Sequence, residues 1–305
     1  MTSSTGLSLD GNTTLPGEPR FPGLLDQGLL KNCFAECVGT YLLVFFGCGA
    51  VRSAVLTGSL SGLWQVAVGW GVAIMLAISV VGPISGAQIN PAISVGLALR
   101  GRLGWRLVGP YMAAPLAGAF LAAATLYGLF SPWLSAKEME KGGKRGQSGS
   151  ELSAMCYGEY FPNPAPLATA PGPYCPQKAE RLAQVVSEPI AFFPEMLGTM
   201  ILAIVVMALT DPKSDQRAGP LTPVFIGLTM SALISVMAPL TQACFNPARN
   251  LRPRLFAFLA GWGKIALPGS TPMGFLAVYV FGPMIGVIAG AYIYDLTLYP
   301  SNVRS

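Results

Sequence analysis

The most constraining feature of the sequence is an Asn-Pro-Ala motif that occurs twice. The copies are Asn90-Pro91-Ala92 and Asn246-Pro247-Ala248, at an offset of 156 residues. Asparagine is a preferred helix N-cap, and proline suits the first helical turn because the N–H that it lacks has no partner there. A single Asn-Pro more often opens an ordinary turn. Two copies at matching places in an apolar chain instead predict two helix N-termini that are aimed at one place.

The composition is typical of a membrane protein. Of the 305 residues, 52% are hydrophobic and only 11% are charged, whereas about a quarter are charged in a typical soluble domain. The 19 basic residues are too few for a nucleic-acid surface. The chain has no histidine, and its six cysteines show no Cys-x-x-Cys spacing. We therefore expect no metal site, no cofactor and no enzyme activity.

Hydropathy along the chain predicts six transmembrane helices and two shorter helices. A span needs about 20 apolar residues, and the segments that follow Asn90 and Asn246 are shorter than that. The capping asparagines use their side-chain oxygens, which leaves the amide NH2 groups to donate hydrogen bonds elsewhere. The six apolar runs cover approximately residues 32–51, 62–81, 107–130, 191–210, 220–238 and 273–298.

The two halves of the chain form an internal repeat. Glu36-Cys-Val-Gly-Thr40 is echoed by Glu195-Met-Leu-Gly-Thr199, and the segment from Tyr111 to Gly118 is echoed by Tyr279 to Gly286. Each half has three spans, an odd number, so the second half is predicted to be inverted relative to the first. The short segments then enter from opposite faces and end at mid-membrane. Non-helical backbone at that depth occurs only where it is buried in protein or lines a water-filled path.

The charged residues predict the orientation and the domain limits. The turn with Arg100, Arg102 and Arg106 has no acidic residue, which favours a cytoplasmic location for this turn and for both termini. The long connector has balanced charge and is then extracellular, where Cys156 and Cys175 either form a disulfide or remain free. The predicted parts are a tail (1–31), a channel domain (32–298) with a first repeat (about 32–130), a loop (about 131–188) and a second repeat (about 189–298), and a C-terminal tail (299–305).

With the doubled motif inside inverted halves, the chain resembles the aquaporin, or major intrinsic protein, family over residues 32–298. The insertion Phe256–Gly263 and Arg254 resemble its aquaglyceroporin branch. The resemblance implies an all-α polytopic membrane protein with two re-entrant half-helices. It also implies a homotetramer in the plasma membrane, each subunit having its own pore. Glu36 and Glu195 correspond to glutamates that brace the pore loops in this family.

The resemblance also implies a four-residue selectivity filter. Trp70 and Arg249 match the glycerol-conducting pattern, whereas Ile234 and Ala243 replace a glycine and an aromatic residue. This set is more similar to that of the nodulin-like intrinsic proteins, which conduct glycerol and uncharged metalloid acids. Further departures from the family pattern are Gln88 in place of histidine, Asn250 in place of aspartate, Arg252 in place of glycine, and Tyr279.

These features predict a passive channel for glycerol, urea, metalloid acids and water that excludes ions and protons. The indole of Trp70 offers an apolar face for a carbon chain, while Arg249 and loop carbonyls bind hydroxyl groups. A water-selective aquaporin is the main alternative. An ion-coupled carrier needs intramembrane groups that change protonation, and only Glu36 and Glu195 are candidates. A non-conducting adhesion member of the same fold is the remaining alternative.

Overall fold

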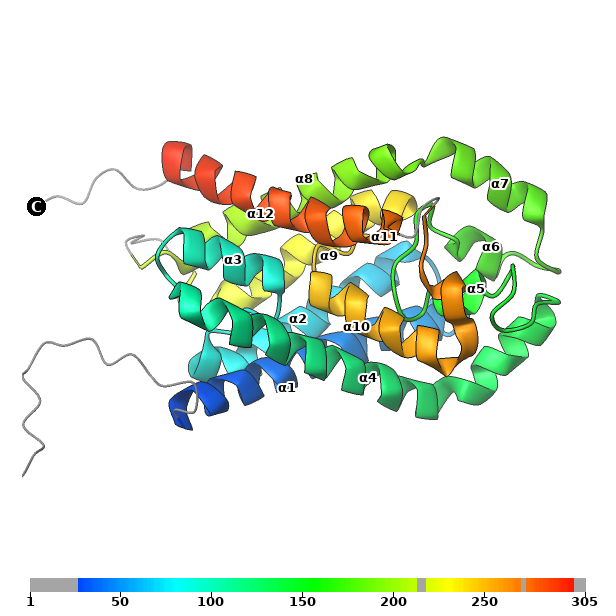
Figure 1. Cartoon of the computed structure of the whole chain (residues 1–305), viewed down its shortest axis with the longest axis horizontal. Helices are drawn as coiled ribbons and strands as arrows, with labels where there is room; N and C mark the ends of the chain where they lie inside the picture. Colours follow the sequence, from blue (N-terminus) through cyan, green and yellow to red (C-terminus); the bar gives the residue numbers. More distant parts are fainter. Residues whose placement is uncertain (1–26, 213–217, 270–272, 299–305) are drawn as a thin grey trace, which may run out of the picture.

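The long helices of the computed structural model run side by side along one axis (Figure 1). The structure describes residues 27–212, 218–269 and 273–298, and these contain no strand. Six helical segments within them are long and apolar enough to cross a membrane, which confirms the predicted all-α polytopic fold. They are α1 (Gln27–Val55), α2 (Leu63–Ser85), α4 (Trp105–Glu140), α8 (Glu188–Thr210), α9 (Thr222–Thr241), and a last segment of α11 (Gly274–Leu276), a π-helical turn (Ala277–Phe281), α12 (Gly282–Ile293) and a second π-helical turn (Tyr294–Leu298).

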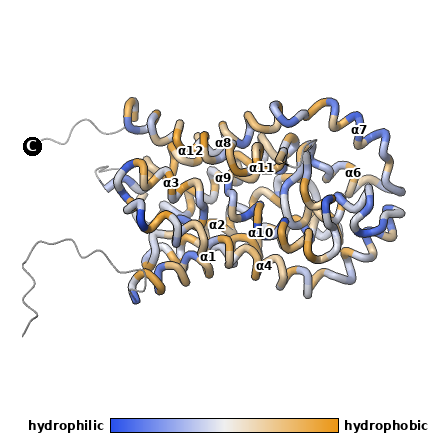
Figure 2. Tube along the Cα trace, in the orientation of Figure 1, coloured by the Kyte–Doolittle hydropathy of each residue, from blue (hydrophilic) through white to orange (hydrophobic). Residues whose placement is uncertain are grey.

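The polarity of the chain follows this arrangement. Apolar residues lie along the long helices, and hydrophilic residues gather at the two ends of the bundle (Figure 2).

Two predicted boundaries differ from the structure. The first helix begins at Gln27 rather than near residue 32, while the rest of the N-terminal tail and residues 299–305 lie outside the described part. The helix α4 continues ten residues past 130, because its charged last turns extend beyond the ~30 Å apolar layer.

Two short helices follow the Asn-Pro-Ala motifs, as the sequence predicts. The helix α3 (Pro91–Leu99) has nine residues and α10 (Pro247–Ala257) has eleven. At 1.5 Å per residue, each is about half as long as an apolar span requires. Figure 1 shows them extending toward opposite ends of the bundle. Their N-termini are therefore the ends that meet near the middle.

Matching residues of the two halves make matching helix crossings. A methyl group added at Gly118 of α4 would lie 2.0 Å from the carbonyl oxygen of Cys37 in α1. One added at Gly286 of α12 would lie 2.2 Å from the carbonyl oxygen of Met196 in α8. Only glycine allows backbones to approach so closely, as is common between membrane helices. The repeat found in the sequence is thus a repeat of packing as well.

The connector between the halves is folded, and it begins after Glu140 rather than at 131. It contains α5 (Glu151–Ala154), α6 (Ala165–Thr169) and α7 (Pro176–Val185). Its buried residues pack with Trp262, which comes from the insertion after α10 and is fully buried. Arg52 of α1 donates hydrogen bonds to the carbonyl oxygens of Cys48 (3.1 Å) and Cys156 (2.6 Å). The connector is therefore a structured cap on one end of the bundle.

In the structure, Cys156 and Cys175 are both free thiols. Cys156 is buried among apolar side chains inside the cap, in one cluster with Leu152 and Trp262. Cys175 is half-buried at the start of α7, where its Sγ lies 3.4 Å from Oε1 of Gln177. These two environments favour the alternative of two free thiols.

The two thiols should differ in reactivity. Burial raises the pKa of Cys156 to about 12, so its thiol stays protonated at pH 8 and does not react as a thiolate. We expect iodoacetamide at pH 8 to modify Cys175 and to spare Cys156 in the folded protein, as read by peptide mass mapping. A sample unfolded in SDS should label at both sites. A Cys156–Cys175 disulfide peptide in an unreduced digest would contradict the structure.

Candidate functional site

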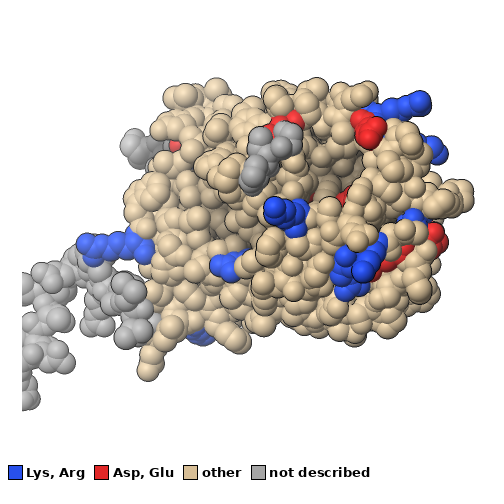
Figure 3. Space-filling view, turned by 45° about the vertical axis from the view of Figure 1, so that its right-hand side comes forward, with Lys and Arg blue, Asp and Glu red and all other residues tan. Residues whose placement is uncertain are grey.

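The bundle contains two cavities, one toward each of its ends. We call the cavity on the side of the cap the outer cavity and the other the inner cavity. The outer cavity has a volume of about 740 Å³ and is lined by Trp70, Glu159, Ile234 and Arg249 among others. Figure 3 shows a hollow at this end, with acidic and basic side chains around it. The inner cavity has a volume of about 470 Å³, and both Asn90 and Asn246 line it. The doubled motif therefore lies on the path that would join the two ends.

The two asparagines connect the two short helices. The Oδ1 of Asn90 accepts from the N–H of Ala92 (2.9 Å), and Oδ1 of Asn246 accepts from the N–H of Ala248 (3.0 Å). Each Nδ2 donates to the residue that precedes the other asparagine, from Asn90 to Phe245 O and from Asn246 to Ile89 O, both at 2.9 Å. One N–H of each amide is thus used inside the protein. The second N–H of each amide remains available to a molecule in the cavity. The sequence alone predicted that both N–H groups would be available.

The loops before the asparagines are held by two buried glutamates. Glu36 accepts from the N–H groups of Gln88 (2.9 Å) and Ile89 (2.6 Å) and from the hydroxyl of Ser85 (2.6 Å). A carboxylate that is removed from water needs such partners. The structure thus places Glu36 where the resemblance implies a brace.

The second half repeats this arrangement atom for atom. Glu195 accepts from the N–H groups of Cys244 and Phe245 (2.9 Å each) and from the hydroxyl of Thr241 (2.6 Å). Like Glu36, it is fully buried. Each pore loop is therefore fixed by one carboxylate that satisfies two backbone donors.

The bonds to the glutamates hold an unusual backbone. Ala87 and Ile89 have φ values of 49° and 43°, and Ala243 and Phe245 have φ values of 56° and 57°. Non-glycine residues rarely adopt positive φ, and each such residue costs about 1–2 kcal/mol. In this backbone conformation the carbonyl of Ile89 accepts from Asn246, and the carbonyl of Phe245 accepts from Asn90. Local strain in the loops is thus linked to the geometry of the site.

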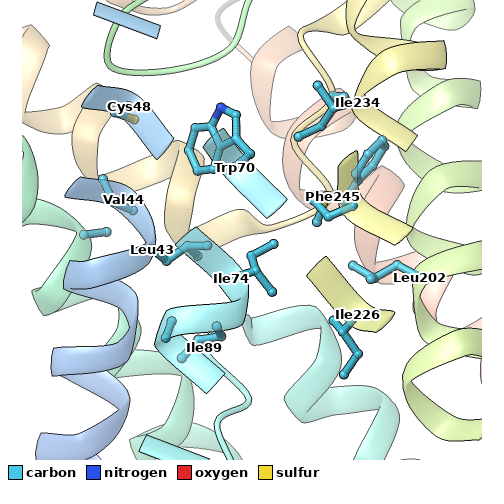
Figure 4. Close-up of a cluster of buried hydrophobic side chains, with 14 of the residues drawn as sticks. Leu43, Val44, Cys48, Trp70, Ile74, Ile89, Leu202, Ile226, Ile234 and Phe245 are labelled. Atoms are coloured by element: carbon cyan, nitrogen blue, oxygen red, sulfur yellow. The ribbon is translucent and has the colours of Figure 1, made fainter. Parts of the chain in front are cut away.

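Of the four residues predicted to form the selectivity filter, Trp70, Ile234 and Arg249 line the outer cavity. The guanidinium carbon of Arg249 lies 3.8 Å from the centroid of the Trp70 ring, a cation–π contact. Figure 4 shows Trp70 and Ile234 on either side of the same space. Arg249 also donates to the carbonyl of Ala243 (3.3 Å). Ala243 thus contributes its backbone oxygen, and its side chain is not among those lining the two cavities.

A fifth residue, Glu159 in the cap, completes this group and was missed by the sequence reasoning. Its Oε1 lies 2.5 Å from Nη1 of Arg249, and its Oε2 accepts from Asn250 (2.7 Å). Arg254 donates to its carbonyl oxygen and to Oδ1 of Asn250. The sequence signals only that a buried arginine requires an anion, and the predicted loop (about 131–188) has six glutamates that the sequence does not distinguish.

The inner cavity contains one further departure from the family pattern. The Oε1 of Gln88 accepts from the hydroxyl of Ser94 (2.6 Å), which fixes the amide in the cavity wall. The described residues contain no cluster of three or more His, Cys, Asp or Glu side chains that would suit a metal ion.

Comparison with known proteins assigns this geometry to a family. The model of the family "Major intrinsic protein" matches residues 24–294, which is most of the chain. The chain belongs to the major intrinsic protein family. It is therefore an integral, multi-pass membrane protein of a family of transporters.

Several relatives of this major intrinsic protein have curated names. It is 37% identical to the glycerol uptake facilitator protein of Pseudomonas aeruginosa over 263 residues, which cover 86% of this chain and 87% of the relative. It is 36% identical to the propanediol uptake facilitator PduF of Citrobacter freundii, with coverages of 88% and 93%. The solved structure of the aquaglyceroporin from Plasmodium falciparum superposes with a TM-score of 0.72 at 24% identity, covering 89% of this chain and 98% of that one, which shows a common fold.

The pairing of Glu159 with Arg249 should contribute to stability. Both side chains are buried, and removing one member of such a pair costs about 3–5 kcal/mol. We expect Glu159→Gln to lower the melting temperature of the detergent-purified protein clearly. The control is Glu180→Gln, which changes an exposed glutamate of α7. Equal melting temperatures for the two variants would show that the pair is not stabilising.

Proposed function

We propose that this protein is a passive channel for glycerol, for other small uncharged solutes and for water. The observation that carries the proposal is the pair of amides of Asn90 and Asn246, which stand between two cavities with one N–H each left to donate. The names of relatives at 36–37% identity, which are glycerol and propanediol uptake facilitators, support this class of solute.

The walls of the path suit a solute with one polar and one apolar edge. On the outer side, the indole of Trp70 presents carbon while Arg249 presents N–H donors. Below the filter, Figure 4 shows the aliphatic side chains of Ile74 and Ile226, which also line the inner cavity. A polyol can exchange hydrogen bonds with the amides and with the arginine while its carbon chain slides along the apolar side.

The deciding experiment compares fluxes of water, glycerol, urea and boric acid in liposomes that contain the purified protein. We expect all four to exceed the rate of protein-free liposomes, without any dependence on an ion gradient. Acceleration of water alone would support the water-selective alternative. Concentrative uptake that an uncoupler abolishes would identify a carrier, and no acceleration at all would fit an adhesion role.

The arrangement of the protein in the membrane is part of the proposal. The turn between α3 and α4 carries Arg100, which is paired with Asp211 (3.4 Å) and Asp295 (2.7 Å), and Arg102, which donates to the carbonyl of Thr210. The basic residues of this turn support a cytoplasmic location for the turn, for both termini and for the inner cavity. We propose the plasma membrane as the membrane that the protein spans. The cap is then extracellular, α3 and α10 are re-entrant, and four subunits form a homotetramer.

Arg249 should be the main barrier to cations. At an effective dielectric constant of about 20, two unit charges about 4 Å apart repel by about 4 kcal/mol, and Glu159 offsets part of this repulsion at Arg249. Replacement by valine also leaves Glu159 as an unpaired anion beside the path. We therefore expect Arg249→Val to raise proton leak in liposomes by more than about tenfold, measured with an internal pH dye. Arg252→Val, on the same short helix but not among the residues lining either cavity, is the control; equal leak in both would contradict this role.

Ala243 should control selectivity among neutral solutes. The side chain of Ala243 lines neither cavity, but a phenylalanine is long enough to reach the path and to add a second aromatic surface beside Trp70. The carbon chain of glycerol slides along two such surfaces more easily than rounder solutes do. Changes on the scale of a methylene in an apolar pocket are worth about 1–3 kcal/mol, so the effect should be about tens-fold. We expect Ala243→Phe to raise the ratio of glycerol to urea flux in liposomes. An unchanged or lower ratio would show that this side chain does not face the path.

A further inference from the structure

The ring of Trp70 occupies space that Gly47 of α1 leaves open. A methyl group added at Gly47 would lie 2.1 Å from Cε3 and Cζ3 of the ring and 2.5 Å from Cδ2. Contacts of side-chain carbons begin at about 3.4 Å, so the ring would have to move by about 1.3 Å. The ring is a rigid plane rather than the end of a flexible chain. Its position therefore depends on the absence of a side chain at residue 47.

The backbone of Trp70 is held on both sides by its neighbours in α2. A methyl group added at Gly69 would lie 2.8 Å from Cβ of Ala50 in α1. One added at Gly71 would lie 2.7 Å from the carbonyl oxygen of Gly227 in α9. The helix α2 is thus in close contact with α1 and α9 directly before and after Trp70. A backbone shift of α2 cannot easily relieve a clash at the ring.

The other side of the ring faces the filter. The guanidinium of Arg249 stacks on it at 3.8 Å, and that guanidinium is held by Glu159 at 2.5 Å. Trp70 is only 3% exposed, so little free space surrounds it. A displacement away from α1 therefore carries the indole toward Arg249 and into the path between the cavities.

We propose that Gly47 is a positioning residue that sets the width of the selectivity filter. It acts through Trp70 and does not itself touch the solute. The proposal rests on the proposed function, since the width matters only if solutes pass this point. According to this proposal, the contact between α1 and α2 at Gly47 determines whether a carbon chain fits beside Arg249, although Gly47 is not one of the four filter residues.

The test compares Gly47→Ala with Gly49→Ala in liposomes. Alanine favours the helix more than glycine does, so neither change should weaken α1 itself. A methyl group at Gly49 meets only Cδ2 of Leu126, at an ordinary 3.8 Å. We expect Gly47→Ala to lower glycerol permeability by about tenfold or more and to lower water permeability much less. Gly49→Ala should keep both. A glycerol-to-water ratio in Gly47→Ala equal to that of Gly49→Ala would overturn the proposal.

A second variant separates a narrowed filter from a misfolded protein. In Gly47→Ala combined with Trp70→Ala, all three ring carbons that the methyl group would meet are absent. We expect the double variant to recover the glycerol-to-water ratio of Trp70→Ala alone, and to recover folding if Gly47→Ala alone fails to fold. The proposal would be overturned if the double variant did not recover the glycerol-to-water ratio, or if it did not fold where Gly47→Ala alone does not fold. If the unmodified protein conducts no glycerol, the proposed function fails first, and the measurement on the unmodified protein shows this independently.

Discussion

The structure depends on the reciprocal hydrogen bonds between the two asparagines. Each amide donates to the carbonyl that precedes the other asparagine, so neither short helix can be placed without its counterpart. The loops that supply these carbonyls are non-helical and lie deep in an apolar bundle, where unsatisfied backbone groups cost several kcal/mol each. Glu36 and Glu195 remove that cost by accepting two backbone N–H groups each. The helix crossings at Gly118 and Gly286 then bring the glutamates to the loops they hold.

The function that we propose arises where the two halves differ. The residue that follows Asn-Pro-Ala is Ile93 in the first half and Arg249 in the second. Ile93 lines the inner cavity, whereas Arg249 lines the outer one and stacks on Trp70. The anion that balances Arg249 comes from the cap, which belongs to neither repeat. The two halves are thus built alike, but the charged pair of Arg249 and Glu159 lies beside only one of the two cavities, on the side of the cap.

Much of this could be predicted from the sequence, because the information was local or repeated. Apolar runs identified the spans, and the doubled motifs identified the short helices and their shared meeting point. Glu159 could not be found in this way, since its contact with Arg249 joins residues far apart through a segment without periodicity. The cross-donation by Asn90 and the open space at Gly47 were missed for the same reason: each is defined by a partner on another helix. The sequence predicts only a long loop here, because the short helices α5, α6 and α7 carry little hydropathy signal.

The cap has a consequence for how such a protein diversifies. Residues in the membrane must stay apolar to suit lipid, which restricts the substitutions they tolerate. The cap lies outside the six apolar spans, so this restriction does not apply to it. Nevertheless, Glu159 of the cap contacts Arg249 directly, and Met155 and Asn163 line the outer cavity. Substitutions in this segment can therefore change the surroundings of Arg249 without altering any residue that contacts lipid. New solute preferences can arise by drift in the cap while the buried frame is retained.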